Sequence, residues 1–263
     1  MNARALPLKR DVAFNCMATP DFFSSEMDYP EARQYTGFVH ARNAATAPDG
    51  IPGSFPIASF SYRIIKPAVD RAIILLAAPV LLPLSLLIAL IVFVTSRGPV
   101  LYRHRRLGRF QQPIHVWKFR TMYQNSDELL AQHLHDDAAA RLEWSSCHKL
   151  RDDPRVTLIG RFLRKTSLDE IPQLLNVLTG EMSIVGPRPI VNEEKSKYGM
   201  YLQAFSYAMP GITGLWQVSG RCDLTYEDRV QLDVRYVTRW SLWMEAKILL
   251  RTVLVMIHRE GAY

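Results

Sequence analysis

The sequence predicts an α/β protein that is attached to a membrane by one apolar helical segment. Three observations predict this class. An uncharged apolar run of 23 residues extends from Ala72 to Val94, alternating strand-like segments follow it, and much of the remainder has helical periodicity. With 263 residues, 48% of them hydrophobic, the chain is long enough for one or two domains with a sizeable core.

Composition limits the classes of partner and site. Lys and Arg outnumber Asp and Glu by 32 to 25, and the net charge of +7 indicates an anionic partner: nucleic acid, anionic lipid or a phosphorylated substrate. The three cysteines, Cys16, Cys147 and Cys222, form no C-x-x-C pair, so neither a disulfide framework nor a structural zinc site is indicated. The histidine spacings and the lack of a G-x-x-x-x-G-K-[ST] sequence exclude zinc hydrolysis and P-loop chemistry.

Residues 1–60 mix Pro, Ala, Ser and charged residues without a sustained period, which predicts a disordered cytoplasmic N-terminal extension. A signal peptide would place its apolar core within roughly the first thirty residues. Here the apolar run begins only at Ala72, so export by cleavage is not expected.

Residues 61–97 are predicted to enter the membrane, because about 20 apolar residues suffice to cross a bilayer as a helix. Pro79 and Pro83 each remove a helical hydrogen bond and favour a kink. Basic residues flank both ends, which places both ends on the cytoplasmic side and favours a hairpin that bends near Pro83. A kinked helix that crosses the bilayer is the alternative. The flanking residues are Arg63, Lys66 and Arg71 on one side and Arg97, Arg103, Arg105, Arg106 and Arg109 on the other.

Residues 98–263 combine strand and helix patterns. Two strands are expected around Leu101 and over 114–119, joined by the turn "GRFQQP", and a helix is expected over 126–145. A turn at 151–155 precedes a helix that stops at Gly180, and "EMSIVGPRP" begins as an apolar strand. The C-terminal segment 242–259 has cationic residues among large apolar ones, which suits either a helix lying on a membrane surface or a buried helix with a cationic edge.

The stretch "TSLDEIPQLL" (166–175) places Asp169 and Glu170 side by side at the start of that helix. Ser167 and Glu170 have the spacing of a capping box, which leaves Asp169 without a structural role. The helix N-terminus and the nearby cations are expected to keep Asp169 ionised. An ionised carboxylate can attack phosphorus or bind Mg²⁺, although caps of this kind are also common without any function.

Two further segments could bind a nucleotide or a phosphate. Prolines on both sides of Arg188 stiffen a loop suited to bidentate phosphate binding, although a stiff loop with a solvated Arg explains the same pattern. "PGITGLWQVSGR" (210–221) sets three glycines beside Trp216, Gln217 and Arg221, and the same composition occurs in ordinary turns.

Taken together and in order, "KFRTM", "DDPRVT", "LRKTSLDEIPQLLNVLTGEMSIVGPRP" and "PGITGLWQVSGR" resemble the bacterial sugar transferase family, the small monotopic phosphoglycosyl transferases. The resemblance covers about residues 62–263 and is closest to members of the exopolysaccharide type. It implies a re-entrant helix in the cytoplasmic leaflet. One departure concerns the bend: many relatives have Ser-Pro there, whereas this chain has Leu82-Pro83 and an additional Pro79.

The resemblance also implies roles for individual residues. Asp169 matches the family's nucleophile, and Glu170 matches its Mg²⁺ ligand, so Mg²⁺ is the expected cofactor. Substrate-binding residues carried over from the family are Lys118, Arg164, Arg188 and Arg221.

The expected fold is thus a monotopic α/β protein with a Pro-broken re-entrant helix, amphipathic interfacial helices and a small cytoplasmic catalytic domain over 98–263. The expected reaction transfers hexose 1-phosphate, with galactose 1-phosphate as the best guess, from UDP-hexose to undecaprenyl phosphate through a phosphorylated aspartate. The expected location is the cytoplasmic face of the bacterial inner membrane. Expected partners are membrane lipids, downstream glycosyltransferases and no nucleic acid, with a homodimer left open. Two alternatives are a non-catalytic scaffold of a polysaccharide assembly complex and a membrane-tethered nucleic-acid binder that uses the basic run from Arg103 to Arg109.

Overall fold

The computed structural model describes residues 53–258 except 97, 148–149, 151 and 221–223. The chain divides into two units, residues 1–43 and 44–263, and every described residue belongs to the second. Most of the expected N-terminal extension therefore lies outside the described residues. Residues 53–60 are described, and the short helix η3 (Pro56–Ala58) buries Ile57 completely, so packed structure begins before the expected boundary at residue 61.

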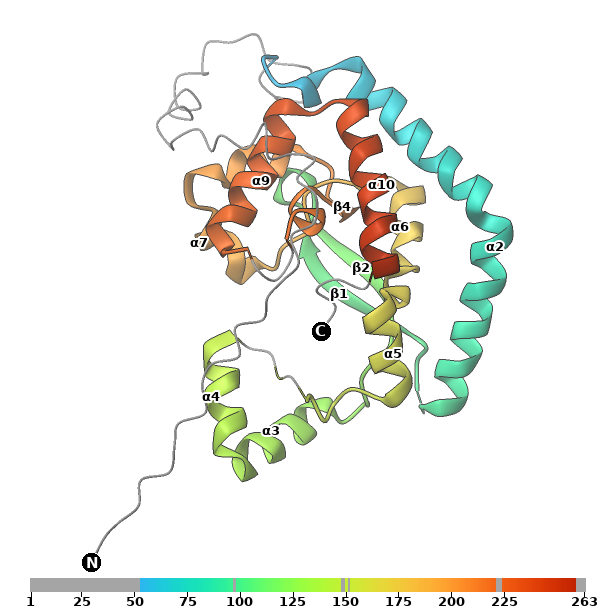
Figure 1. Ribbon diagram of the computed structural model, residues 1–263, viewed down its shortest axis with the longest axis vertical. Coiled ribbons are helices and arrows are strands. Elements are labelled where there is room, and N and C mark those ends of the chain that lie inside the picture. Colours follow the sequence, from blue (N-terminus) through green and yellow to red (C-terminus); the bar gives the residue numbers. More distant parts are fainter. Residues whose placement is uncertain (1–52, 97, 148–149, 151, 221–223, 259–263) are drawn as a thin grey trace, which may run out of the picture. The chain divides into compact units, whose positions relative to one another are not determined.

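The apolar run forms one long helix, α2 (Lys66–Thr95), which follows a π-helical turn, η4 (Ser61–Ile65). The combined segment is the single described helix long and apolar enough to cross a membrane. The expected break into two arms is not confirmed, because α2 stays helical through Pro79 and Pro83 and is drawn as one bowed ribbon (Figure 1). Near the second proline the Ser85 hydroxyl donates to the Leu81 carbonyl at 2.6 Å, a contact that favours helix bending.

Two antiparallel strands confirm the predicted hairpin. β1 (Leu101–Leu107) pairs with β2 (Pro113–Phe119) from Leu101↔Phe119 to Leu107↔Pro113. The turn between them contains η5 (Arg109–Gln111). Side chains of the alternating β2 residues Ile114 and Val116 are buried, as the period-two pattern requires.

The single helix expected over 126–145 is wrong in one respect. The structure has two helices, α3 (Ser126–Asp136) and α4 (Ala138–Cys147), separated by Asp137 in an extended conformation. The Asp137 carboxylate accepts hydrogen bonds from the Ala139 and Ala140 amides at 2.7 and 3.2 Å. These hydrogen bonds stabilise an extended Asp137 that caps the next helix, so one continuous helix does not form. The apolar periodicity is the same on both sides of Asp137 and therefore does not reveal the break.

The central segments follow as α5 (Leu158–Thr166), η6 (Leu168–Glu170), α6 (Gln173–Thr179) and β3 (Ser183–Val185). Gly180 ends α6 with φ 83°, which confirms the predicted stop signal. β3 pairs in parallel with β4 (Gly211–Thr213). The remaining elements are η7 (Asn192–Glu194), α7 (Lys195–Tyr198), η8 (Gly199–Tyr201), α8 (Leu202–Tyr207), η9 (Trp216–Val218), α9 (Tyr226–Arg239) and α10 (Leu242–His258).

Three buried clusters hold these elements together. The first joins η3, η4, α9 and α10 around Tyr236 and Ile248. The second and third attach α2: Ile74 packs with β2 and α6, and Ile88 and Val92 pack with Phe119 and the α5 residue Leu163. Both halves of α2 therefore pack on the same α/β domain.

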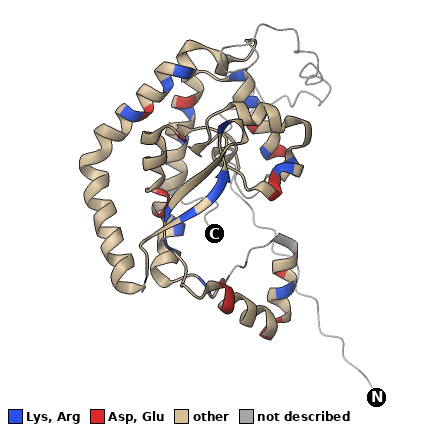
Figure 2. Ribbon diagram, turned by 180° about the vertical axis from the view of Figure 1, so that it is seen from behind, with Lys and Arg blue, Asp and Glu red and all other residues tan. Residues whose placement is uncertain are grey.

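The outward side of α2 is apolar and exposed. Seven of its large side chains are 62–82% exposed: Leu75, Leu76, Val80, Leu82, Leu86, Phe93 and Val94. Figure 2 shows charged residues at the first turns of α2 and along the β1–β2 hairpin, and none along the rest of α2. α10 likewise buries Ile248 but exposes Trp243, Leu250 and Val253. The sequence allowed either an interfacial or a buried helix here, and α10 has one buried face and another that is apolar and exposed.

Candidate active site

Asp169 and Glu170 lie in η6, the short turn that connects α5 to α6. The predicted capping box is wrong: Ser167 has φ 56° and ends α5, and its side chain makes no cap hydrogen bond to η6. A positive φ at Ser167 turns the chain sharply between the two helices. The Glu170 side chain does not cap the turn and can contact cations. The tight turn at Ser167 sets the positions of both carboxylates.

Lys118 on β2 is the cation that the two carboxylates share. Its Nζ lies 2.6 Å from Glu170 Oε1 and 3.7 Å from Asp169 Oδ2. Arg188 Nη2 lies 3.4 Å from the same Glu170 oxygen. Four residues predicted from three separate motifs therefore meet at one place: Lys118, Asp169, Glu170 and Arg188.

The segment "KFRT" explains how β2 positions this site, because its four residues have four different partners. Lys118 contacts the carboxylates, and Phe119 is buried against α2 and α5. The Arg120 Nη2 atom donates to the Ser96 carbonyl at 2.7 Å and to the Ser96 hydroxyl at 2.8 Å, which ties β2 to the end of α2. Thr121 Oγ1 accepts from Arg164 Nε at 2.9 Å.

α5 brings Arg164 to the site through a close approach to the end of β2. Thr157 caps α5 by accepting from the Gly160 amide at 2.8 Å. A Cβ atom at Gly160 would lie 2.0 Å from the Thr121 carbonyl oxygen, so only glycine allows this packing. Arg164 is near enough to Asp169 that the carboxylate raises the pKa of the guanidinium against the larger, lowering effect of burial.

The loop of Arg188 is fixed by an equally close backbone contact. The Gly186 amide donates to the Thr213 carbonyl at 2.9 Å, and the Gly211 amide donates to the Pro187 carbonyl at 2.8 Å. Cβ atoms at Gly186 and Gly211 would lie 2.2 and 2.1 Å from main-chain atoms of the facing segment. These glycines therefore allow the strand ends to approach closely and set the start of the Pro-Arg-Pro loop.

Sequence reasoning missed two site residues on β1, His104 and Arg106. Arg106 Nη1 lies 3.8 Å from Glu194 Oε2, and its Nη2 lies 3.3 Å from His104 Nδ1. Burial lowers the pKa of His104 to about 4, and the charges of Arg106, Lys118 and Arg188 act in the same direction, so His104 is neutral at pH 7. Both share a face of the hairpin with Lys118, which is known only from the observed strand register.

The two carboxylates differ electrostatically. Burial has the largest effect on Glu170 and alone would raise its pKa, but Arg188 and Lys118 together outweigh it and lower the pKa to about 2. At Asp169 burial dominates and raises the pKa, aided by the charge of Glu170 and opposed by Lys118 and Arg164. Burial of the Asp169 side chain therefore has a larger effect on its pKa than the neighbouring cations, and the expectation that Asp169 is ionised stays a prediction.

These residues fit Mg²⁺ as a partly substrate-held ion. Mg²⁺ usually binds one or two carboxylates together with substrate phosphates. The adjacent carboxylates supply such oxygens, and both cationic contacts of Glu170 fall on Oε1 rather than Oε2. No group of three or more His, Cys, Asp or Glu suited to a metal occurs among the described residues.

The other predicted residues are placed as follows. Arg221 lies outside the described residues. Pro83 lies within α2. The Trp216 ring, expected to be able to stack on a nucleotide base, lies under the Arg229 guanidinium at 4.9 Å and packs against the first buried cluster. Its position is explained by core packing.

Comparison with known proteins identifies the family. The bacterial sugar transferase family matches residues 61–259. The chain belongs to this family. The match includes α2 and the segments that carry Lys118, Arg164, Asp169, Glu170 and Arg188.

Several curated relatives of this sugar transferase are similar in sequence. Undecaprenyl-phosphate galactose phosphotransferase of Salmonella typhimurium is 51% identical over 166 residues, which cover 63% of this chain and 35% of the relative. UDP-galactose-lipid carrier transferase of Erwinia amylovora is 46% identical over 209 residues, 79% of this chain and 43% of the relative. The chain thus spans less than half the length of these two. Exopolysaccharide production protein ExoY of Rhizobium meliloti is 42% identical over 224 residues, 84% of this chain and 99% of the relative.

Proposed function

We propose that this sugar transferase moves hexose 1-phosphate from UDP-hexose to undecaprenyl phosphate and releases UMP, as the first membrane step in building an exopolysaccharide repeat unit. The observation that carries the proposal is the meeting of Asp169 and Glu170 with Lys118 and Arg188 beside an apolar helix. The names of the relatives support a lipid phosphate acceptor and favour galactose as the hexose.

The two carboxylates have separate roles in this proposal. Glu170 is strongly acidic and has both cations on Oε1, which makes it a weak nucleophile and a suitable ligand for a metal. Asp169 is buried and more basic, and Lys118 Nζ is 3.7 Å away, beyond hydrogen-bond distance. Two neighbouring acids whose pKa values are moved apart are typical of a divided catalytic task. Asp169 is the nucleophile.

The reaction proceeds in two phosphoryl transfers. An Asp169 oxygen attacks the sugar-proximal phosphorus of UDP-hexose, the bond from that phosphorus to the bridging oxygen breaks, and UMP leaves with the electron pair. A phosphate oxygen of undecaprenyl phosphate then attacks the same phosphorus and releases the Asp169 carboxylate. The product is undecaprenyl diphosphate hexose, the substrate for downstream glycosyltransferases. Lys118, Arg164 and Arg188 would balance the charge of the phosphates.

Mg²⁺ fits this scheme as the cofactor. When bound, it would neutralise charge on the diphosphate. Glu170, with the substrate phosphates, would hold it. Glu170→Gln is expected to raise the Mg²⁺ concentration needed for half-maximal rate while leaving the attacking group in place.

The packing of α2 supports a placement of the protein on one side of the membrane. Ile74 and Ile88 are 14 residues apart, roughly 20 Å along a helix, and both pack on the same charged domain. That domain cannot enter the hydrocarbon core, so both halves of α2 must stay near its surface. We propose that α2 lies in the cytoplasmic leaflet of the bacterial inner membrane, with its exposed leucines toward lipid.

The test is UMP release by the purified full chain. UDP-galactose with undecaprenyl phosphate should give UMP and a lipid-linked phosphosugar, and a parallel reaction with UDP-glucose identifies the preferred hexose. Asp169→Asn should abolish release, whereas Lys165→Met, a charge change on the exposed side of α5, should not. A folded wild-type protein that releases no UMP from either nucleotide sugar would support the scaffold alternative.

A further inference from the structure

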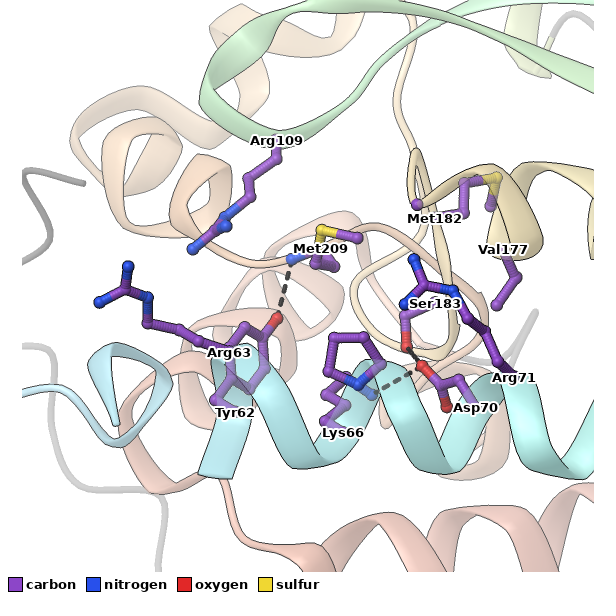
Figure 3. A pocket seen from close by; sticks show the side chains of 12 residues that line it. Tyr62, Arg63, Lys66, Asp70, Arg71, Arg109, Val177, Met182, Ser183 and Met209 are labelled. Atoms are coloured by element: carbon purple, nitrogen blue, oxygen red, sulfur yellow. Dashed lines mark hydrogen bonds and ion pairs between the residues drawn. The ribbon is translucent and has the colours of Figure 1, made fainter. Parts of the chain in front are cut away.

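A cavity of about 250 Å³ lies at the first turns of α2, apart from the carboxylates (Figure 3). Residues of η4, α2, the turn after β1, and the end of α6 with β3 line it. Its lining contains four cationic side chains and one carboxylate: Arg63, Lys66, Arg71, Arg109 and Asp70. The cavity is therefore strongly cationic.

The buried pair in this lining has a structural role. Lys66 Nζ lies 2.5 Å from Glu245 Oε1 on α10 and 3.7 Å from Asp70 Oδ2. Asp70 Oδ2 also accepts from the Ser183 hydroxyl at 2.6 Å. Lys66 is thus paired with Glu245 and Asp70 and joins α2 to β3 and α10, which leaves the three arginines as the groups that give the cavity its positive charge.

Two of the arginines are oriented by main-chain carbonyls. Arg71 Nε donates to the Leu178 carbonyl at 3.4 Å, at the end of α6, and Arg109 Nε donates to the Tyr207 carbonyl at 3.0 Å. Figure 3 shows the guanidinium groups of Arg63 and Arg109 on one side of the cavity and that of Arg71 on the other. Guanidinium groups that surround a small space match a phosphate, which accepts from them bidentately.

The opposite side of the same helical turns is apolar. Ile64, Val69 and Leu76 are 56, 43 and 82% exposed, whereas Arg63, Lys66, Asp70 and Arg71 line the cavity. A cationic face and an apolar face on one short helical segment are typical of the level of lipid headgroups. A ligand that uses both faces needs an anionic group for the cavity and an apolar tail that lies along α2. Such a ligand is an amphiphile.

We propose that the cavity binds the phosphate headgroup of an anionic phospholipid and so fixes the depth of α2 in the membrane. Its volume is below the roughly 300 to 1,000 Å³ of pockets that enclose drug-sized ligands, so a headgroup fits and a whole nucleotide sugar does not. It is a separate site from the carboxylates. Its lining includes none of the residues that meet at the candidate active site: Lys118, Asp169, Glu170 and Arg188.

Binding can be measured without reference to catalysis, so this inference stands apart from the proposed reaction. The full chain in a neutral detergent is titrated with dioctanoyl phosphatidylglycerol, dioctanoyl phosphatidylcholine and inorganic phosphate, with calorimetric detection. The test variant is Arg63→Gln/Arg71→Gln/Arg109→Gln. The matched control, Arg141→Gln/Lys197→Gln/Arg239→Gln, removes three exposed cations outside the cavity.

Wild type and control should bind phosphatidylglycerol more tightly than phosphatidylcholine or inorganic phosphate. The test variant should bind phosphatidylglycerol at least about 10-fold more weakly, because charge-assisted hydrogen bonds are lost. Arg63→Gln alone, which leaves both carbonyl contacts in place, should weaken binding about 10-fold, the loss expected for one such bond. Equal affinity for the two lipids, an equal loss in the control, or inorganic phosphate binding as tightly as phosphatidylglycerol would each overturn the proposal.

Discussion

Replacing Lys118 with Met tests how one cation serves two carboxylates. The variant keeps the aliphatic stem and removes the ammonium group, which lies 2.6 Å from Glu170 and 3.7 Å from Asp169. A hydrogen bond to a charged group contributes about 1.5 to 3 kcal/mol. The Lys118 side chain is 24% exposed and Arg188 still contacts Glu170, so we expect the lower part of that range, about 2 kcal/mol.

The pH dependence of this loss has a definite sign. The pKa of Glu170 is about 2 in the folded protein and 4.5 ordinarily, so its stabilisation is fully present above pH 4.5 and is lost as pH falls toward 2. Losing about 2 kcal/mol corresponds to a rise of about 1.5 in that pKa. The wild type should therefore be about 2 kcal/mol more stable than Lys118→Met at pH 7, with a smaller difference below pH 4.5.

The assay is urea unfolding of the full chain in detergent, followed by tryptophan fluorescence at pH 7 and pH 3.5. Lys118 lowers the pKa of Asp169, so removing its charge should raise that pKa. In Lys118→Met the fall in the rate of UMP release at acid pH should therefore begin at a higher pH than in the wild type. Lys165→Met is the control for lost charge. Equal stability of wild type and Lys118→Met at pH 7, or a difference that grows as pH falls, would refute the reasoning.

Three further predictions concern the membrane helix and the buried network. Cysteines introduced near positions 60 and 110 should both be labelled from the cytoplasm, because both halves of α2 pack on the same charged domain; periplasmic labelling of either position would contradict the proposed placement. Burial raises the pKa of Asp233 to about 8 against the lowering effect of the Tyr198 hydroxyl, so the melting temperature should fall from pH 6 to pH 9 and Asp233→Asn should reduce that fall; an unchanged slope would count against a neutral Asp233. Lys66→Met alone should cost about 3 to 5 kcal/mol of unfolding free energy, and adding Glu245→Gln should recover part of it; additive losses in the double variant would show that the 2.5 Å pair is not coupled.

Patterns of regular period predicted much of the fold. Alternation in the β1–β2 segment and apolar spacing before Gly180 depend only on which side of an element is buried, and both predictions are confirmed. The break at Asp137 and the turn at Ser167 depend on single side-chain and backbone choices that leave the apolar pattern unchanged. The spacing of Ser167 and Glu170 therefore predicted a capping box that does not form, because Glu170 contacts Lys118 and Arg188 instead.

The site was predicted in part because its residues lie in distinctive motifs. Lys118, Asp169, Glu170 and Arg188 lie together in the structure, and the roles that the resemblance implies for them stay predictions. His104 and Arg106 were missed because one side chain in a basic strand looks like another until the strand register is known. The raised pKa of Asp169 also required the structure, since burial outweighs charges that are visible in the sequence.

Trapping the covalent intermediate is the most direct measurement of the central claim, that Asp169 attacks phosphorus. The wild type is incubated with UDP-galactose without lipid acceptor, then digested and mapped by mass spectrometry. We expect one phosphohexose per active chain on the peptide containing Asp169, no adduct in Asp169→Asn, and a retained adduct in Glu170→Gln at high Mg²⁺. A label on Glu170, or an Asp169→Asn protein that still releases UMP, would contradict the account.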